Sequence, residues 1–306
     1  MTIPTSRTRE AAVVTINQEH CCGCGLCATV CNDFLFRVEN GKAALVTDKS
    51  LFGCYGCGHC MAICPKDAIR VHGRTLTPEH IFSLPERETR ASYGQLLGML
   101  QSRRSIREFK DAPVEPHFIE KILDAAKTAP MGLPPSDINV LVLDSREKNR
   151  AFAQDFCDFL KKVRWIVSPW FLAMMRPFWG KTTDELFRGF VKPAIHCYID
   201  AMDEGVNLVT YDAPLTMYFY GSPYVDPADP IIAATYAMLS AESLGLGACM
   251  IGAIHPMIQR GKQAKRFRER HGIQYPSQEG IFVIFGHPAV VYNKGIQRTF
   301  ASVTYV

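Results

Sequence analysis

Apolar residues recur at helical spacing in the C-terminal two thirds of the chain and predict helices there. The first is expected over residues 93–101 and the next over residues 116–129. The helix over 116–129 would present five apolar side chains on one face: Phe118, Ile119, Ile122, Leu123 and Ala126. Pro130 is expected to end this helix, because proline cannot continue one. The almost wholly apolar run 229–254 predicts a long helix that ends in a glycine-rich turn.

Short apolar runs bounded by turn residues predict strands in both halves of the chain. Within the first 80 residues such runs lie near positions 12–16, 35–38, 43–46 and 69–72. Farther along, INVLVLD (138–144) and GIFVIFGHPAV (280–290) indicate buried strands. Together these elements predict an α+β fold. The polar residues 81–91 are expected to link a domain of residues 1–80 to a domain of residues 92–306.

The composition is typical of a globular protein. The chain has 306 residues, of which 47% are hydrophobic and 21% charged, and its formal net charge is +4. These values exclude a disordered chain and give no overall indication of nucleic-acid or membrane binding. The first residues lack the apolar core of a signal peptide, so a cytoplasmic location is expected. Residues 165–175 come nearest to a membrane span, but Pro169 interrupts them, which favours a core or lid segment.

Nine of the 12 cysteines precede residue 65 and fall into two runs with the same spacing. Each run follows the pattern C-x2-C-x2-C-x3-C, and matching glycines show that the second repeats the first. The first run is Cys21, Cys24, Cys27 and Cys31, and the second is Cys54, Cys57, Cys60 and Cys64. A secreted disulfide scaffold would be small and carry a signal peptide, so metal-bound thiolates in a reducing cytosol fit better.

The spacing of the two runs is typical of iron–sulfur clusters. Three thiolates two residues apart can hold one face of a [4Fe–4S] cube, and the fourth is expected to start a short helix and point to the other cluster. One cluster is therefore assigned to Cys21, Cys24, Cys27 and Cys64. The other is assigned to Cys54, Cys57, Cys60 and Cys31, which leaves Cys22 over. Zinc is the alternative, although zinc sites usually pair two C-x2-C hooks over a longer spacer.

Residues 103–114, RRSIREFKDAPV, follow the helix predicted over 93–101 and group arginines with a serine. Arginine forks match phosphate oxygens, and a hydroxyl completes such a grip. The alternative for the same residues is a solvated basic turn. The stretch GLGACMIG (245–252) faintly resembles a dinucleotide-binding fingerprint. Because it follows a helix instead of a strand, no separate dinucleotide-binding domain is predicted.

These motifs resemble two known families. Residues 1–80 resemble a bacterial-type two-cluster ferredoxin. Residues 92–306 resemble the nitroreductase family of flavoproteins in the order of their parts, which are the arginine–arginine–serine signature, a helix with a Pro/Gly loop, a long helix with an LGLG turn, and a late arginine before a last strand. The resemblance implies a ferredoxin–nitroreductase fusion with two [4Fe–4S] clusters, FMN bound by an α+β domain, and a homodimer with each FMN at the subunit interface.

The nitroreductase resemblance also implies flavin contacts. The ribityl chain, phosphate and pyrimidine edge of FMN would be held by Arg103, Arg104, Ser105 and Arg107, and the phosphate also by Lys294 and Arg298. The flavin ring near N5 would lie along Met250, Ile251 and Gly252. The flavin of the partner subunit would be reached by Pro130, Met131 and Gly132. The family often has Pro-Ser-x-x-Asn in this loop, whereas Leu133 and Pro134 follow here, so backbone contacts are expected.

Several other side chains have two interpretations. The aromatic residues of an insert at 155–224 either shape a pocket over the flavin or fill the core and the dimer interface. Candidate proton donors among them are Tyr211, Tyr218 and Tyr224. Buried, inert thiols are expected at Cys157, Cys197 and Cys249. The basic helix expected over 259–272 either docks an acidic electron donor or is a solvated face.

The sequence thus predicts an iron–sulfur flavoenzyme. Single electrons would pass through the clusters to FMN, and hydride transfer from N5 would reduce a small acceptor such as a nitro compound, a quinone or an activated C=C bond. In the alternative, NAD(P)H reduces the FMN and the clusters exchange electrons with a protein partner such as a ferredoxin or flavodoxin. A hypothesis of another class is a redox sensor or electron carrier, which predicts no substrate-sized cavity over the flavin.

Overall fold

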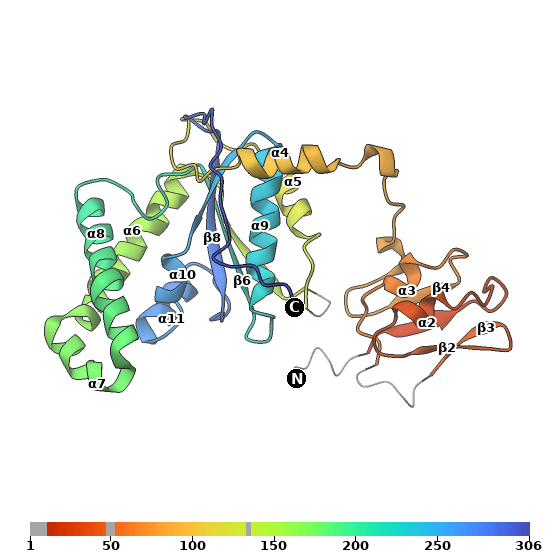
Figure 1. Ribbon diagram of the computed structural model, residues 1–306. Coiled ribbons are helices and arrows are strands. Elements are labelled where there is room, and N and C mark those ends of the chain that lie inside the picture. Colours follow the sequence, from red (N-terminus) through yellow and green to blue (C-terminus); the bar gives the residue numbers. More distant parts are fainter. Residues whose placement is uncertain (1–10, 47–52, 133–135) are drawn as a thin grey trace. The chain divides into compact units, whose positions relative to one another are not determined.

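The computed structural model describes residues 11–46, 53–132 and 136–306. The chain divides into two compact units (Figure 1). The first comprises the described residues up to Arg90 together with those of Met131–Asp137 and Tyr224–Asp226, and the second comprises the rest. Two short 3-10 turns, η1 (Pro78–His80) and η2 (Arg87–Thr89), lie near the end of the first unit.

Two antiparallel strand pairs build the first unit. The strand β1 (Val13–Ile16) pairs with β4 (Ile69–His72), and β2 (Phe36–Glu39) pairs with β3 (Lys42–Leu45). All four strands lie where the apolar runs predict them. Their inward side chains and several cysteine side chains form one small core that includes Phe36, Ala43 and Val71. The strands therefore hold the cysteine loops against a packed interior.

The short helices of the first unit do not begin at the fourth cysteine of each run, so that prediction is wrong. The helix α2 (Leu26–Val30) contains Cys27, and Cys31 follows it in extended conformation. The helix α3 (His59–Ala62) contains Cys60 and ends before Cys64. Each helix is preceded by a glycine with φ 77°, Gly25 or Gly58. Glycine adopts this left-handed conformation at little cost, so the chain turns into the helix before the third cysteine.

A four-stranded antiparallel sheet forms the centre of the second unit. Its order is β5 (Ile138–Leu143), β6 (Leu215–Gly221), β8 (Gly280–Gly286) and β7 (Gly247–Ile251). The strands predicted at 138–144 and 280–290 are β5 and β8. The sequence analysis did not identify β6, because LTMYFYG is buried at every position and shows no alternation of apolar and polar residues.

The apolar run 229–254 is not one helix, as predicted. It forms α9 (Ala228–Ser243), a turn, and then the strand β7. The turn contains Gly245 with φ 76°, a conformation that ends the helix. Beyond it, β7 pairs with β8, with Ala248 opposite Phe285. Because both faces of β7 are covered, its apolar run has no strand periodicity that would distinguish it from a buried helix.

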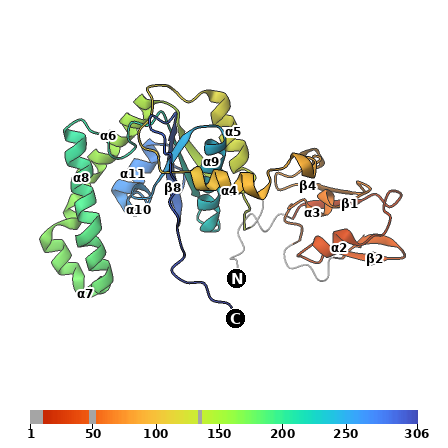
Figure 2. The same cartoon turned by 45° about the horizontal axis from the view of Figure 1, so that its top comes forward.

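Helices cover both faces of this sheet (Figure 2). One face packs against α5 (Pro116–Ala126) and α9, and α4 (Tyr93–Ser102) also contacts α9. The predicted apolar face of α5 is confirmed, since its five residues all belong to this core. The helix ends four positions before Pro130. The other face packs against α6 (Arg146–Val163), α8 (Lys192–Asp203), α10 (Ile254–Met257) and α11 (Lys262–Arg270).

A helical hairpin connects α6 to α8. It consists of η3 (Arg164–Val167), α7 (Pro169–Leu186) and the single π-helical turn η4 (Phe187–Val191). Gly180, with φ 76° and ψ 176°, breaks the regular helix inside α7. Val167 and Leu172 are buried, whereas Trp165, Trp170 and Met174 are exposed. The segment 165–175 is therefore not a core segment. No helix in the described chain is long and apolar enough to cross a membrane.

Beyond β8 the described chain contains no further helix or strand. The last strand expected after Arg298 is therefore absent, because no strand of the sheet pairs with residues 299–306. This segment is exposed along its whole length.

Candidate functional site

The first set of predicted cluster ligands lines one hollow in the first unit. Its walls include the thiols of Cys21, Cys24 and Cys27 from the first run and of Cys64 from the second. Two backbone amides donate hydrogen bonds to these sulfurs: the Ala43 N–H to Cys21 Sγ and the Ala68 N–H to Cys64 Sγ, each at 3.3 Å. The Ala43 amide is the main cause of a lowered pKa of the Cys21 thiol. Such donors stabilise thiolate ligands and tune an iron–sulfur cluster.

The second set of predicted ligands also lies together. Burial, together with the nearby sulfurs of Cys54, Cys57 and Cys31, raises the pKa of the Cys60 thiol to about 12. Burial likewise raises the pKa of Cys54, with contributions from Cys57 and Cys31. Each set thus combines three cysteines of one run with the fourth of the other. Cys22, the residue left over, also lines the hollow of the first set, and it is exposed, as the assigned ligands Cys24 and Cys57 are.

Glycines allow the cysteine loops to pack closely. A Cβ atom at Gly23 would lie 2.0 Å from the carbonyl oxygen of Gly41, so no side chain fits there. Gly23 and Gly56 also have φ values of 68° and 71°. Among the described residues, no three His, Cys, Asp or Glu groups are arranged to hold a single metal ion. Four thiols with amide donors at the sulfurs fit the ligand set of a [4Fe–4S] cluster.

In the second unit, the arginine–serine segment lies against the edge strand of the sheet. Arg103 caps α4 through its backbone N–H, and Ser105 then forms an isolated parallel bridge with Ala248 of β7. The Ile106 N–H donates to the Ala248 carbonyl at 3.1 Å. This approach needs a glycine at position 247, because a Cβ there would lie 2.8 Å from the Ile106 side chain. The segment therefore runs beside the strand that carries Met250 and Ile251.

The Arg104 side chain connects this segment to the part of the chain that follows β8. One guanidinium nitrogen, Nη1, donates to the carbonyls of Gln101 and Arg103 at 2.8 and 2.7 Å. The other, Nη2, contacts the carbonyl of Lys294 at 3.4 Å. Nε is buried and makes no hydrogen bond with any residue that the structure describes. A buried, unpaired N–H on a cation is suited to an anionic oxygen. Arg298 makes no hydrogen bond or ion pair with the described residues.

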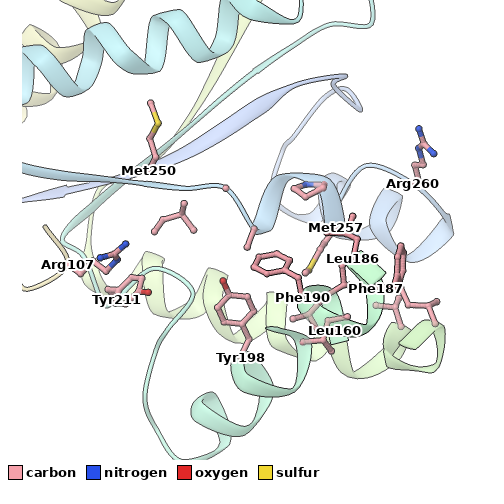
Figure 3. A pocket seen from close by; sticks show the side chains of 18 residues that line it. Arg107, Leu160, Leu186, Phe187, Phe190, Tyr198, Tyr211, Met250, Met257 and Arg260 are labelled. Carbon is pink, nitrogen blue, oxygen red and sulfur yellow. The ribbon is translucent and has the colours of Figure 1, made fainter. Parts of the chain in front are cut away.

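A cavity of about 770 Å³ lies beside the end of β7 (Figure 3). Arg107, Met250, Ile251 and Gly252, all predicted flavin contacts, line one part of it. The remaining wall is mostly apolar and comes from α6, α8, α10 and the hairpin; it includes Leu160, Leu186, Phe187, Phe190, Tyr198, Tyr211 and Met257. A cavity of this size and character is typical of small-molecule sites. The sequence analysis had assigned no role to Leu186, Phe187 or Phe190, because apolar residues of a pocket wall have no periodicity that distinguishes them from core.

Of the three candidate proton donors, only Tyr211 lines the cavity. Tyr218 is buried in the core, hydrogen-bonded to His255 Nδ1 at 2.9 Å, and burial raises its pKa. Tyr224 is exposed and belongs to the first unit. The guanidinium carbon of Arg107 lies 5.6 Å from the centre of the Tyr211 ring.

The backbone around Tyr211 is held in an unusual conformation. Tyr211 and Asp212 have φ values of 54° and 44°, a left-handed conformation that is rare for residues other than glycine. Hydrogen bonds at Asp212 maintain it: Arg150 Nη1 donates to Oδ2 at 2.7 Å and Asn207 Nδ2 to Oδ1 at 2.8 Å. Arg146 donates to the Asp212 carbonyl. Such strain persists only where the surroundings fix it, and it is common at functional sites.

The other predicted residues have mixed outcomes. Cys157 and Cys249 are buried as expected, and burial raises the pKa of Cys157 to about 12. Cys197 is exposed, so the expectation of a buried thiol is wrong there. It lies on the outer face of α8, whose buried side chains are Ile195, Ile199 and Met202. The basic helix is α11, which packs through Ala264, Phe267 and Arg268.

The partner-facing loop is described only in part. Met131 and Gly132 group with the first unit, where a Cβ at Gly132 would lie 3.0 Å from the side chain of Asp226. Leu133 and Pro134 lie outside the described residues. The contacts of this loop with a flavin of the partner subunit stay a prediction.

The sequence was compared with protein families, curated proteins and solved structures. Residues 100–287 match the nitroreductase family, and residues 20–69 match the 4Fe-4S dicluster domain. No curated protein matches. Similar solved structures include a nitroreductase with bound FMN from Desulfitobacterium hafniense DCB-2, at 22% identity and TM-score 0.46, covering 69% of this chain and 97% of that one. Another is a nitroreductase with bound FMN from Bacteroides fragilis NCTC 9343, at 15% identity and TM-score 0.47, covering 69% and 98%.

The division of the cysteines can be tested by a matched pair of substitutions. Cys21→Ser removes a ligand from a set of four, and we expect anaerobically purified protein to lose about four of about eight irons per chain. Cys22→Ser changes the neighbouring exposed thiol and should retain all of them. Iron and sulfide determination with electron paramagnetic resonance of the reduced protein measures both. Equal iron loss in the two variants would contradict the assignment.

Proposed function

This chain belongs to the nitroreductase family and carries a 4Fe-4S dicluster domain, and from this premise we propose how it works as an oxidoreductase. Its two clusters receive single electrons and deliver them to FMN. Bound FMN stores two electrons and supplies a hydride equivalent at N5 to a small acceptor. Both clusters are held by the two mixed sets of four cysteines in the domain of residues 1–80, and FMN is bound by the domain of residues 92–306, with residues 81–91 as the linker. The protein acts as a homodimer in the cytoplasm.

The observation that carries this proposal is the meeting of the arginine–serine segment with β7. There Arg104 contacts the Lys294 carbonyl through Nη2, and its buried Nε makes no hydrogen bond with the described residues; the FMN phosphate would bind at this guanidinium. From there β7 leads along Met250 and Ile251 to the cavity. Arg103, Ser105, Arg107 and Arg298 would complete the grip on the phosphate, ribityl chain and pyrimidine edge. Gly252 would allow the backbone to approach the flavin ring, and Pro130, Met131 and Gly132 would reach the partner's flavin.

The cavity supports an enzyme over a redox sensor or a pure electron carrier. A sensor needs room for the flavin alone, whereas the space of about 770 Å³ beside Met250 and Ile251, which would also take the flavin ring, extends along the apolar wall to Leu186 and Phe190. Its apolar wall with a few polar groups suits a flat, conjugated acceptor. A quinone, a nitro compound or an activated C=C bond has this character.

The source of the electrons is tested by anaerobic stopped-flow reduction of the holoenzyme. We expect reduced ferredoxin to bleach the clusters first and the flavin afterwards, because the cluster domain is the entry. In Cys21→Ser, flavin reduction by ferredoxin should slow at least ten-fold while the FMN content stays the same. Rapid flavin bleaching by NAD(P)H alone would instead support the alternative, in which the clusters exchange electrons with a protein partner.

Tyr211 is proposed as the proton donor to the acceptor, since it is the candidate tyrosine that faces the cavity and its backbone is fixed. Tyr211→Phe should lower kcat about 100-fold for an activated alkene, whose carbon must take a proton from an acid. The rate of flavin reduction should not change. Tyr198→Phe removes another cavity hydroxyl and serves as the control. The solvent isotope effect on kcat is measured for both variants. The role of Tyr211 would be contradicted if only Tyr198→Phe lost this effect. It would also be contradicted if the two variants were equally active.

A further inference from the structure

The helical hairpin of residues 164–191 exposes a patch of large apolar side chains. It consists of Trp165, Trp170, Met174, Phe178, Leu186 and Phe190. Trp170 is 61% and Phe178 is 79% exposed. Large apolar side chains are more stable buried than in contact with water. Several such residues on one short hairpin are unusual for a surface that faces only water.

The exposure of this patch is not a sign of a loosely packed hairpin. Rings of this segment pack against one another: Trp179 stacks on Phe187 with centroids 4.6 Å apart, and Phe171 packs edge-on against Trp165, a patch residue, at 5.0 Å. Val167 and Leu172 are each only 1% exposed and anchor the hairpin to the unit. The hairpin therefore has its own interior, and Trp165 and Trp170 pack against it on one side while they stay more than half exposed.

The charges around the patch are mostly positive. Residues 161–192 contain seven lysines and arginines but only two acidic residues, Asp184 and Glu185. Both acids are paired: Asp184 with Arg188 at 2.9 Å and Glu185 with Lys181 at 3.7 Å. Within the described chain, Lys162, Arg164 and Lys192 make no ion pair. Of these three, Arg164 lies in the hairpin and Lys162 and Lys192 flank its two ends, so the unpaired charge at the hairpin's base is basic and complements an anionic surface.

The patch is continuous with the cavity. Leu186 and Phe190 are 53% and 56% exposed, and both also line the cavity (Figure 3). Their exposed surface includes what they present to the open cavity, so these two patch residues are shared with the cavity wall. An apolar molecule in contact with Leu186 and Phe190 would therefore already touch that wall.

We propose that this hairpin docks on the surface of an anionic phospholipid bilayer, and that an apolar acceptor dissolved in the bilayer enters the cavity from there. Aromatic side chains with adjacent lysines and arginines are the combination that binds the lipid interface. The docking itself is independent of the redox chemistry, whereas the acceptor rests on the proposed function. A quinone with an alkyl tail fits this route. Its reduction to the hydroquinone takes a hydride from reduced flavin, which becomes oxidised, and one proton from water or Tyr211.

Tryptophan fluorescence tests the docking directly. The protein has three tryptophans, Trp165, Trp170 and Trp179, all in the hairpin. Vesicles of phosphatidylcholine with about 30% phosphatidylglycerol should bind the holoenzyme in sedimentation. With brominated lipid they should also quench the emission. Pure phosphatidylcholine vesicles should bind at least ten-fold less, and salt should weaken binding to the anionic ones. Absence of quenching, or equal binding to both vesicles, would overturn the proposal.

Variants locate the docking surface. Trp170→Ser with Phe178→Ser should lower vesicle binding at least ten-fold, and Arg164→Gln with Lys192→Gln should lower it about five-fold per charge removed. Tyr93→Ser is the control, since Tyr93 is 78% exposed on α4, away from the hairpin. Light scattering measures the particle mass, which tests the alternative that a second copy of this chain covers the patch. A smaller particle mass of Trp170→Ser with Phe178→Ser, or its unchanged vesicle binding, would overturn the proposal.

Activity separates the docking from the proposed function. With a long-tailed quinone in anionic vesicles, Trp170→Ser with Phe178→Ser should lose most of its turnover, while its turnover of a water-soluble short quinone stays the same. If both quinones lose turnover equally, the hairpin acts on the flavin site and the entry route is wrong. If wild-type protein docks on the vesicles but reduces neither quinone, quinones are not its acceptors, and the docking on the bilayer is still supported.

Discussion

The second unit depends on one close approach, between the chain at residues 105–106 and the edge strand β7. The Ile106 N–H donates to the Ala248 carbonyl, and only a glycine at position 247 leaves room for the Ile106 side chain. This contact covers the outer edge of β7 and directs the arginine–serine segment along it. Without it, Arg104 and Arg107 would be part of a solvated turn. With it, both lie at fixed places along β7, and Arg107 lines the cavity.

The same strand connects the core to the chemistry. Alternate residues of β7 enter opposite cores: Ala248 packs with α5 and α9, and Cys249 and Ile251 pack with α6 and its neighbours. The strand is thereby fixed from both sides, which makes it a rigid support for a flat cofactor. The opposite wall of the cavity is formed largely by the helices α6 and α8 and by their hairpin. The exposed apolar patch of this hairpin is the proposed entry route of an apolar acceptor to the cavity.

The sequence alone predicts most of what is local and little of what depends on burial. The eight cysteines are identified by spacing, and the strands around them by short apolar runs with turn residues between. The strands β6 and β7 were not predicted, because residues buried on both faces lose the alternation of a strand. The exposure of Trp170 and Phe178 could not be predicted either, since an apolar residue has the same pattern in a core and on a surface. Arg104 was identified by its motif. Its unpaired Nε could not be predicted, because the hydrogen bonds of a guanidinium depend on which carbonyls the fold brings near it.

The most direct test of the account is the affinity of the protein for FMN when Arg104 is changed to glutamine. Titration of the flavin-free protein, followed by quenching of flavin fluorescence, measures it. Loss of a charged hydrogen bond to the phosphate predicts binding about 10–100-fold weaker, with unchanged iron content. Arg266→Gln removes an exposed arginine of α11 and should bind FMN as the wild type does. Equal affinity of Arg104→Gln and Arg266→Gln would contradict the placement of the flavin at β7.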